Sequence, residues 1–165
     1  MGRCRGKEKG ETKFMKACFI ASSGGHWEEL LCLKEIAQEY DTVYVTEEGG
    51  QASDSNLEKV YALSQINRHE KNFAMHFTKL LFQAAKIMLQ EKPDFIVTTG
   101  ALLAFPFCVY AKLMRSKIIY IESFARVYNR SLTGKLVYPF ADLFLVQWES
   151  LLQFYPKAKY VGGIF

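Results

Sequence analysis

The segment from Ala17 to Leu30, ACFIASSGGHWEEL, has the residue types and spacing best suited to chemistry. Its Ala17–Ala21 part is a short apolar run, which is typical of a buried strand. A glycine-rich turn, Ser22–Gly25, leads into a helical pattern that begins at His26. A strand, a glycine turn and a helix N-terminus together present unpaired N–H groups that favour a phosphate or a developing oxyanion. The imidazole of His26 lies at this junction, where it could serve as a base.

A purely structural interpretation of the same turn stays open. The glycine pair could form only a tight connection, and His26 could be a surface cap. Glu28 and Glu29 in the first helical turn already compensate the helix dipole, which argues against a fully charged phosphate there. The candidate substrate-binding residues of the turn are Ser23, Gly24 and Gly25.

Strand and helix patterns alternate along the whole chain and define the scaffold that must position this turn. Apolar strand patterns cover Ala17–Ala21, Thr42–Thr46, Val60–Leu63, Phe95–Thr99, Lys117–Ile121 and Leu143–Val146. Helical patterns cover Trp27–Tyr40, Asn72–Gln90, Leu102–Arg115 and Trp148–Phe154. Such alternation predicts an α/β fold with a doubly wound, Rossmann-like parallel sheet and right-handed crossovers.

Two further strand ends carry candidate site residues, because ligands of an open α/β sheet gather at the carboxyl ends of its strands. Gly100 follows the fourth strand pattern in a second small-residue turn. Glu122, Ser123 and Arg126 follow the fifth. Glu122 could act as a base, accept a hydrogen bond from a sugar hydroxyl, or pair with Arg126, and these alternatives stay open.

The helix predicted over Asn72–Gln90 is apolar around most of its circumference. Core packing explains part of this surface, and any exposed remainder predicts a face for a membrane or a partner protein. We expect Phe73, Phe77 or Leu81 to lie at that face. Arg68, in the basic approach to the helix, either contacts a lipid-linked phosphate or lies in a solvated loop.

Composition and charge restrict the class of protein. The length of 165 residues fits one domain with a real core, since half of the residues are hydrophobic. The net charge of +4 lies within residues 1–16, so we expect residues 1–14 to be a disordered basic tail and residues 15–165 a single domain. The four cysteines form no CxxC pair and suit a reducing cytoplasm. We expect no metal, no cofactor and no nucleic acid partner.

Several segments together resemble a known family. SSGGH with its helix, KPDFIVTTG, IIYIESFARV, SLTGKLVYPFAD, LFLVQW and YVGGIF resemble, in order and spacing, bacterial capsular and exopolysaccharide glycosyltransferase subunits of the CpsF/PssD type. These are similar to the membrane-associated subunit of the eukaryotic two-subunit N-acetylglucosaminyltransferase that acts on dolichol-linked sugar. The strand–GGH and strand–Glu corners also look like the acceptor half of MurG-type transferases. The resemblance covers Met15–Phe165.

The resemblance implies the N-terminal half of a GT-B glycosyltransferase. This half would bind a lipid-linked saccharide acceptor and the membrane surface, while a separate chain would bind the UDP-sugar. By analogy, Gly24, Gly25 and His26 line the cleft between the halves, with Gly100 and Glu122 on matching loops. We expect His26 to be the catalytic base, with Glu122 as the second candidate. The sequence shows no N-terminal anchor like that of the eukaryotic subunit, so we expect attachment at the cytoplasmic face of the cell membrane to be peripheral or through the partner.

The expected reaction moves a sugar from UDP to an undecaprenyl-diphosphate-linked saccharide during capsule or exopolysaccharide synthesis. The chain would be one subunit of this hexosyltransferase and inactive without its partner. Two other classes stay open. The chain could be a non-catalytic scaffold that recruits and activates a catalytic glycosyltransferase subunit at the membrane, or a self-contained nucleotide-binding Rossmann enzyme.

Overall fold

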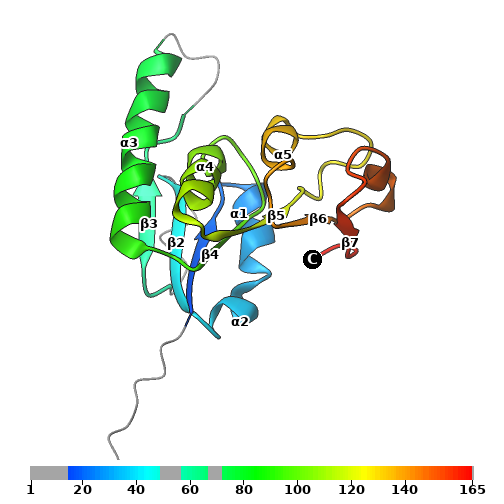
Figure 1. Ribbon diagram of the computed structural model, residues 1–165, viewed down its shortest axis with the longest axis horizontal. Coiled ribbons are helices and arrows are strands. Elements are labelled where there is room, and N and C mark those ends of the chain that lie inside the picture. The colour runs from blue at the N-terminus through cyan, green and yellow to red at the C-terminus, as the bar shows by residue number, and fades with distance from the viewer. Residues whose placement is uncertain (1–14, 49–56, 67–71, 165) are drawn as a thin grey trace, which may run out of the picture.

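The computed structural model describes residues 15–48, 57–66 and 72–164, and within them the chain forms one parallel sheet with helices on both faces (Figure 1). The strands are β1 Lys16–Ile20, β2 Asp41–Glu47, β3 Val60–Leu63, β4 Phe95–Thr98, β5 Lys117–Ile121, β6 Leu143–Val146 and β7 Lys159–Tyr160. The helices are α1 Gly25–Leu31, α2 Lys34–Ala37, α3 Phe73–Glu91, α4 Ala104–Met114, α5 Leu132–Val137 and the 3₁₀ helix η1 Glu149–Gln153. The predicted tail, residues 1–14, lies outside the described residues.

The order of the strands in the sheet is β3-β2-β1-β4-β5-β6-β7, and every neighbouring pair is parallel. The chain therefore builds outward from β1 in one direction, then returns and continues from β4 in the other. Between β1 and β4 the direction of winding reverses, which is where open α/β sheets bind their ligands. The predicted doubly wound parallel sheet is confirmed.

Two apolar layers bury the two faces of the sheet. Helix α1 packs on one face through residues such as Trp27 and Leu30, together with Phe19 and Tyr44 of the sheet. Helices α3, α4 and α5 pack on the other face, around Ile20, Ile96 and Ile118. Central strands buried from both sides are mostly apolar. All four residues of β4 are accordingly buried.

The predicted helix Trp27–Tyr40 is wrong as one element, because the structure divides it. The Leu33 N–H binds the Leu30 carbonyl at 3.0 Å, a tighter turn than the α-helical pattern, and α2 then begins at Lys34. The sequence patterns also missed α5 and β7. Helix α5 has only six residues, including Gly134, and β7 has two, so neither is long enough to show a repeating hydrophobic pattern.

The exposed apolar side chains of α3 are not those expected from the sequence. Phe73, Phe77 and Leu81 are half-buried, and the rings of Phe73 and Phe77 stack at 5.6 Å. The exposed apolar residues of this helix are Met75, Phe82 and Leu89. Within the described residues, no helix is both long and apolar enough to cross a bilayer.

At the amino-terminal edge of the sheet, Glu91 forms a buried ion-pair cluster. Its side chain is 2 % exposed and contacts Lys16 (Nζ–Oε2 2.7 Å) and Lys59 (Nζ–Oε1 2.8 Å). Tyr61 donates its hydroxyl to the same carboxylate. Burial alone would raise the pKa of Glu91, but these hydrogen bonds outweigh it and lower the pKa to about 2.

We expect Glu91→Gln to lower the free energy of unfolding by about 2–3 kcal/mol at neutral pH, because two lysines lose their shared partner. Since the pKa of the folded state lies below that of the unfolded state, the wild type keeps this contribution above about pH 4.5 and loses it as the pH falls toward about 2. Urea unfolding across this range should show a flatter pH profile for the variant. Asp41→Asn is the matched control, because Asp41 also pairs with Lys16 but is 60 % exposed. A cost for Asp41→Asn as large as that for Glu91→Gln would contradict this assignment.

Candidate functional site

The turn between β1 and α1 has the open geometry that the sequence indicated. Gly24 has φ 81° and ψ −143°, a conformation that glycine adopts without strain, and its carbonyl accepts the Trp27 N–H at 2.9 Å. No heavy atom lies within 4 Å of where a Cβ would stand at Gly24 or Gly25. The backbone of this turn therefore faces open space that another molecule can occupy. Helix α1 begins directly after it, with His26 as its second residue.

His26 lies at the reversal point between β1 and β4, beside Gly100. Its Cε1 would be 3.7 Å from a Cβ at Gly100, and its carbonyl accepts the Thr99 hydroxyl at 2.8 Å. The imidazole is half-buried, and its Nδ1 is buried without a hydrogen-bond partner among the described residues. The structure thus brings together the first two predicted turns, which follow the neighbouring strands β1 and β4.

Gly100 allows this close approach. It has φ 107°, and an added Cβ would lie 2.8 Å from the Tyr120 hydroxyl. The Thr98 hydroxyl accepts the Gly100 N–H at 3.0 Å and holds the turn. Any larger residue would push against either the sheet or the imidazole of His26.

Glu47, at the end of β2, binds the turn from the neighbouring strand. Its Oε2 accepts the Ser23 hydroxyl at 3.3 Å, and Glu47 is only 7 % exposed. Burial raises the pKa of Glu47, while hydrogen bonds from Ser23 and the positive field of His26 partly oppose the shift. Ser23 therefore has a protein partner, which its prediction as a substrate ligand did not include.

Glu29, three residues after His26, connects α1 to the loop after β5. Its Oε1 accepts the Ser123 hydroxyl at 2.9 Å and the Phe124 N–H at 3.0 Å. Gln147, after β6, approaches the other oxygen at 3.4 Å. Burial raises the pKa of Glu29, opposed chiefly by the Ser123 and Phe124 hydrogen bonds. Helix α1 and the loops after β5 and β6 are therefore joined through one buried carboxylate.

Glu122 lies beneath the site and not in its open part. It is fully buried, and its Oε2 accepts the Tyr155 hydroxyl at 2.6 Å and the Ser131 N–H at 3.3 Å. Its Oε1 accepts the Ser123 N–H at 3.2 Å. These contacts fix the start of α5 and leave no approach for an acceptor hydroxyl. They support a structural role, and the catalytic role remains a prediction without structural support.

Among the remaining candidates, the structure separates Arg126 from Glu122. Arg126 is exposed and donates to the Asn129 side chain at 3.0 Å, while its backbone N–H binds the Ser123 carbonyl. Within the described residues, the expected alternative of a Glu122–Arg126 ion pair does not form. Arg68 lies outside the described residues. The loops after β1, β4 and β5 nevertheless share one edge of the sheet, as the sequence predicts.

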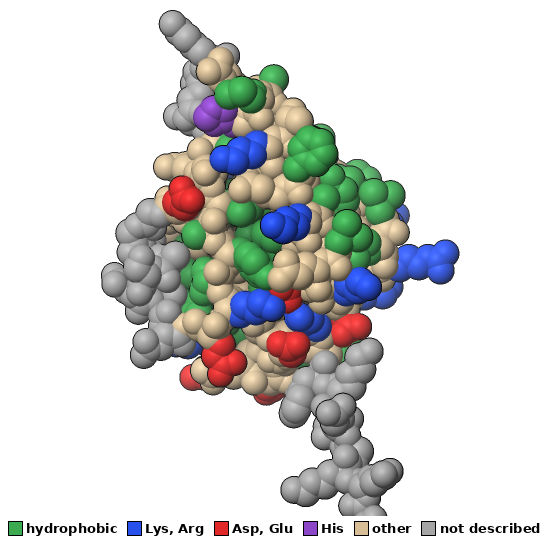
Figure 2. Space-filling view, turned by 90° about the vertical axis from the view of Figure 1, so that its left-hand side faces the viewer, with side chains coloured by type: hydrophobic (Ala, Val, Ile, Leu, Met, Phe, Trp, Pro, Cys, Tyr) green, Lys and Arg blue, Asp and Glu red, His purple; other side chains and the backbone are tan. Residues whose placement is uncertain are grey.

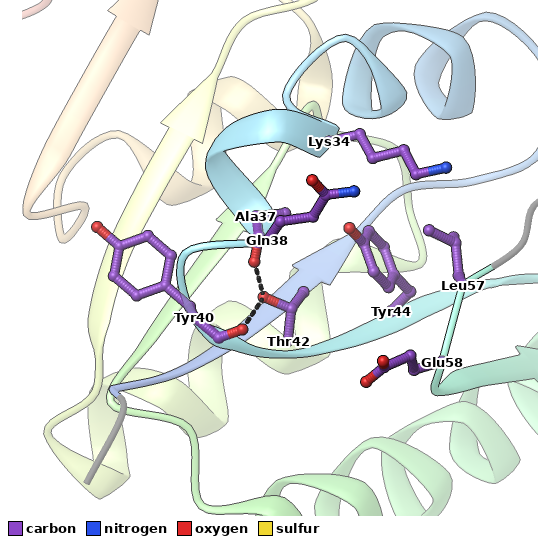
Figure 3. Close-up of a pocket in the computed structure, with 8 residues that line it drawn as sticks. All are labelled: Lys34, Ala37, Gln38, Tyr40, Thr42, Tyr44, Leu57 and Glu58. Atoms are coloured by element: carbon purple, nitrogen blue, oxygen red, sulfur yellow. Dashed lines mark hydrogen bonds between the residues drawn. The ribbon is translucent and has the colours of Figure 1, made fainter. Parts of the chain in front are cut away.

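A separate hollow lies away from these loops. Figure 3 shows Lys34, Gln38 and Tyr44 converging on it between α2 and the first half of β2. Its volume is about 200 Å³, and no predicted site residue lines it. The candidate site remains the group of loops at the carboxyl edge of the sheet, and this hollow is separate from it.

Comparison with known proteins identifies the family. The family described as "Oligosaccharide biosynthesis protein Alg14 like" matches residues 17–164. The chain belongs to the Alg14 family. A relative named UDP-N-acetylglucosamine transferase subunit ALG14, from Yarrowia lipolytica, is 33% identical, with 89% of this chain and 80% of that protein covered. The mouse protein of the same name is 27% identical, with 91% and 83% covered.

Solved structures confirm the fold of this Alg14 family member. Acinetobacter baumannii MurG matches with a TM-score of 0.72 at 19% identity, covering 90% of this chain and 45% of MurG. UDP-N-acetylglucosamine 2-epimerase from Rickettsia bellii matches with a TM-score of 0.70 at 13% identity, covering 92% and 45%. The chain thus spans slightly less than half the length of each of these proteins. The expected likeness to one half of a GT-B enzyme is confirmed.

The eukaryotic side of the expected resemblance is confirmed, and the bacterial side needs correction. The matching relatives are Alg14 subunits of eukaryotes, and the CpsF/PssD assignment with its capsule context is not supported. The site residues predicted from the sequence of this Alg14 family member did not include Glu29, Glu47 or Gln147. For Glu47, its position directly after a strand was an available signal, because carboxyl ends of strands form the binding edge.

Proposed function

We propose that this chain is the acceptor-side subunit of a two-chain glycosyltransferase that uses a UDP-sugar, with UDP-N-acetylglucosamine as the first candidate donor. The observation that carries the proposal is that His26 lies beside Gly100, at the point where the winding of an Alg14-family sheet reverses. An open glycine turn, a half-buried imidazole and neighbouring carboxylates suit a reaction in which a hydroxyl loses a proton as it attacks.

In this mechanism His26 removes the proton from the acceptor hydroxyl. Its buried Nδ1 leaves the other ring nitrogen as the one able to reach a substrate. Glu29 and Glu47 both interact electrostatically with the imidazole. The exposed Gly24–Gly25 turn faces open space where polar groups of the acceptor would lie.

The acceptor in this proposal is a saccharide on a polyprenyl diphosphate, reached at the cytoplasmic face of a membrane. The names of the relatives support the class of donor, and the family description supports an acceptor that belongs to oligosaccharide biosynthesis. The most specific version of this acceptor is a saccharide on an undecaprenyl carrier in capsule or exopolysaccharide synthesis. The eukaryotic relatives do not favour that version.

The partner chain supplies the second α/β domain. A GT-B enzyme binds donor and acceptor between two such domains, and this chain matches about half of MurG. We expect the purified chain to show no sugar transfer and only weak UDP-sugar affinity. Adding the UDP-sugar-binding subunit should restore transfer to a lipid-linked acceptor, measured with radiolabelled donor. Tight UDP-sugar binding by this chain alone in calorimetry, or turnover without a second protein, would instead support a self-contained Rossmann enzyme.

A further inference from the structure

Helix α1 carries His26 but has few local contacts that fix its own position. It has only seven residues, about half the length at which an isolated helix becomes stable in water. Its N-cap residue is Gly24, and no side-chain hydrogen bond caps the helix within the described residues. No heavy atom lies within 4 Å of a Cβ placed at Gly24 or Gly25. The orientation of α1, and with it the position of the imidazole, therefore depends on tertiary contacts.

Tertiary contacts of two kinds hold α1. Trp27 and Leu30 bury apolar surface against the sheet. Apolar packing has no preferred direction, so it keeps the helix on the sheet more firmly than it fixes the rotation of the helix. Glu29 supplies the directional contacts, because its carboxylate accepts hydrogen bonds from the loops after β5 and β6. Glu29 follows His26 by three residues, so the two side chains are one helical turn apart.

The carboxylate of Glu29 cannot leave these partners without a large cost. Glu29 is only 3 % exposed. No lysine or arginine of the described residues pairs with it. Its hydrogen-bond donors are therefore what compensates its burial, and a buried carboxylate that loses them is strongly destabilised. A movement of α1 must then carry these loops with it.

Gln147 extends the network from Glu29 to the last described residues. It directly follows β6 and is 1 % exposed. Its Nε2 donates to Glu29 at 3.4 Å and to the Glu122 carbonyl at 3.1 Å, and its Oε1 accepts the Ile164 N–H at 3.0 Å. The nitrogen faces two acceptors and the oxygen faces a donor, so only this orientation of the amide fits. A displacement of Ile164 thus reaches Glu29 through one planar side-chain amide.

Phe124 forms a second connection between the same parts of the chain. Its N–H donates to Glu29, and a Cβ at Gly163 would lie 3.2 Å from its ring. Trp148 also holds this residue, since the ring centroids are 4.8 Å apart and the indole Nε1 donates to the Phe124 carbonyl at 2.7 Å. Gly163 and Ile164 therefore contact two residues that bind Glu29 directly.

We propose that Glu29 and Gln147 are positioning residues that couple Gly163 and Ile164 to α1 and so set the alignment of His26. The purpose of this alignment rests on the proposed function, because a base misplaced by about 1 Å can lose about a hundredfold in rate. The Thr99 hydroxyl binds the His26 carbonyl at 2.8 Å. Breaking the link at Glu29 therefore loosens α1 without releasing it.

The first test is NMR spectroscopy of the full chain by itself, without partner or substrate. Gln147→Met keeps a side chain of similar length and removes its amide. We expect the imidazole signals of His26, assigned by their loss in His26→Ala, to shift or broaden in this variant. Gln153→Met is the matched control, because Gln153 is exposed and donates to the Ser150 carbonyl of its own helix at 2.8 Å. It should leave the His26 signals unchanged.

His76 provides an internal reference in the same spectra. It lies on α3, which covers the face of the sheet opposite to α1. Figure 2 views the molecule from the side of α3, where hydrophobic and basic side chains are mixed at the surface. The signals of His76 should stay unchanged in Gln147→Met. A shift of His76 as large as that of His26 would indicate general loosening of the fold and overturn the proposal.

The second test is sugar transfer by the two-chain complex at saturating partner concentration. Gln147→Met and Glu29→Gln should each lower kcat about tenfold and leave the KM for the UDP-sugar unchanged. The double variant should lose no more than either single variant, because both substitutions break the same link. Losses that multiply in the double variant would contradict a shared link.

A variant at Ile164 keeps the proposal testable if Gln147→Met does not fold. Ile164→Pro removes the N–H that binds Gln147 and leaves the other side chains of the network in place. Its His26 signals should shift, whereas Ile164→Ala keeps the N–H and should not shift them. Equal His26 signals in these two variants would overturn the proposal.

The outcomes separate this inference from the proposed function. Unchanged His26 signals in Gln147→Met, or the same shift in Gln153→Met, would overturn the coupling. Normal kcat in Gln147→Met, where His26→Ala has lost transfer, would overturn the positioning role. Normal kcat in both variants would instead contradict the catalytic role of His26, while the NMR shifts would still support the coupling.

Discussion

His26→Ala should lower the rate of sugar transfer by about a hundredfold or more, the loss typical of removing a general base. The imidazole is half-buried, and its Nδ1 makes no hydrogen bond among the described residues, so the fold should tolerate its removal. The Thr99 hydroxyl binds the backbone carbonyl of His26 and would keep the turn in place. The measurement is kcat with the partner chain, donor and acceptor present, and circular dichroism confirms folding.

Glu28→Ala is the matched control for this experiment. Glu28 follows two residues later on α1 and is exposed. Its substitution should leave transfer close to that of the wild type. Near-normal turnover in His26→Ala would remove His26 from the mechanism. Because Glu122 is already buried beneath the site, that outcome would favour a non-catalytic scaffold that recruits and activates the partner.

Gly134→Ala should lower the free energy of unfolding by about 2–3 kcal/mol, even though alanine is the better helix former. An added Cβ would overlap Glu122 Oε2 and lie 2.7 Å from the Tyr155 hydroxyl and 2.8 Å from the Ser131 hydroxyl. Hydrogen bonds hold these groups in place around Glu122, so none can move away cheaply. Thermal or urea unfolding measures the loss.

Gly25→Ala is the control for stability, because an added Cβ there has no heavy atom within 4 Å. It should be neutral or slightly stabilising. Glu122→Gln tests the same network chemically, since an amide N–H₂ would face Tyr155 or a backbone N–H and lose an accepted hydrogen bond. We expect lower stability but normal transfer per folded complex. Lost transfer at unchanged stability would restore Glu122 as a catalytic candidate.

Local pattern was sufficient for most of the scaffold. The strands over Val60–Leu63, Lys117–Ile121 and Leu143–Val146 begin and end where the sequence predicts them. An apolar run between turn residues predicts a buried strand, because exposing such a run to water costs free energy in any fold. Glycine at positions 24 and 100 likewise indicated the two turns, and both adopt positive φ.

Only the tertiary structure decided which of these pieces meet. The pairing of β1 with β4 brings His26 to Gly100, and no local pattern specifies the order of strands. Glu29 binds Ser123, which is 94 residues away in the sequence. The position of Glu29 near the helix N-terminus could not predict this contact. Glu122 follows a strand as an active-site carboxylate would, yet α5 and Tyr155 cover it.

The same distinction applies to α3. Its sequence determined that the helix has more apolar surface than one contact buries, because that property belongs to the helix itself. The neighbouring α4 and the sheet decided that Phe73, Phe77 and Leu81 are half-covered while Met75, Phe82 and Leu89 face outward. Periodicity determines which residues share a face, whereas exposure depends on what packs against that face, and this is a property of the whole fold.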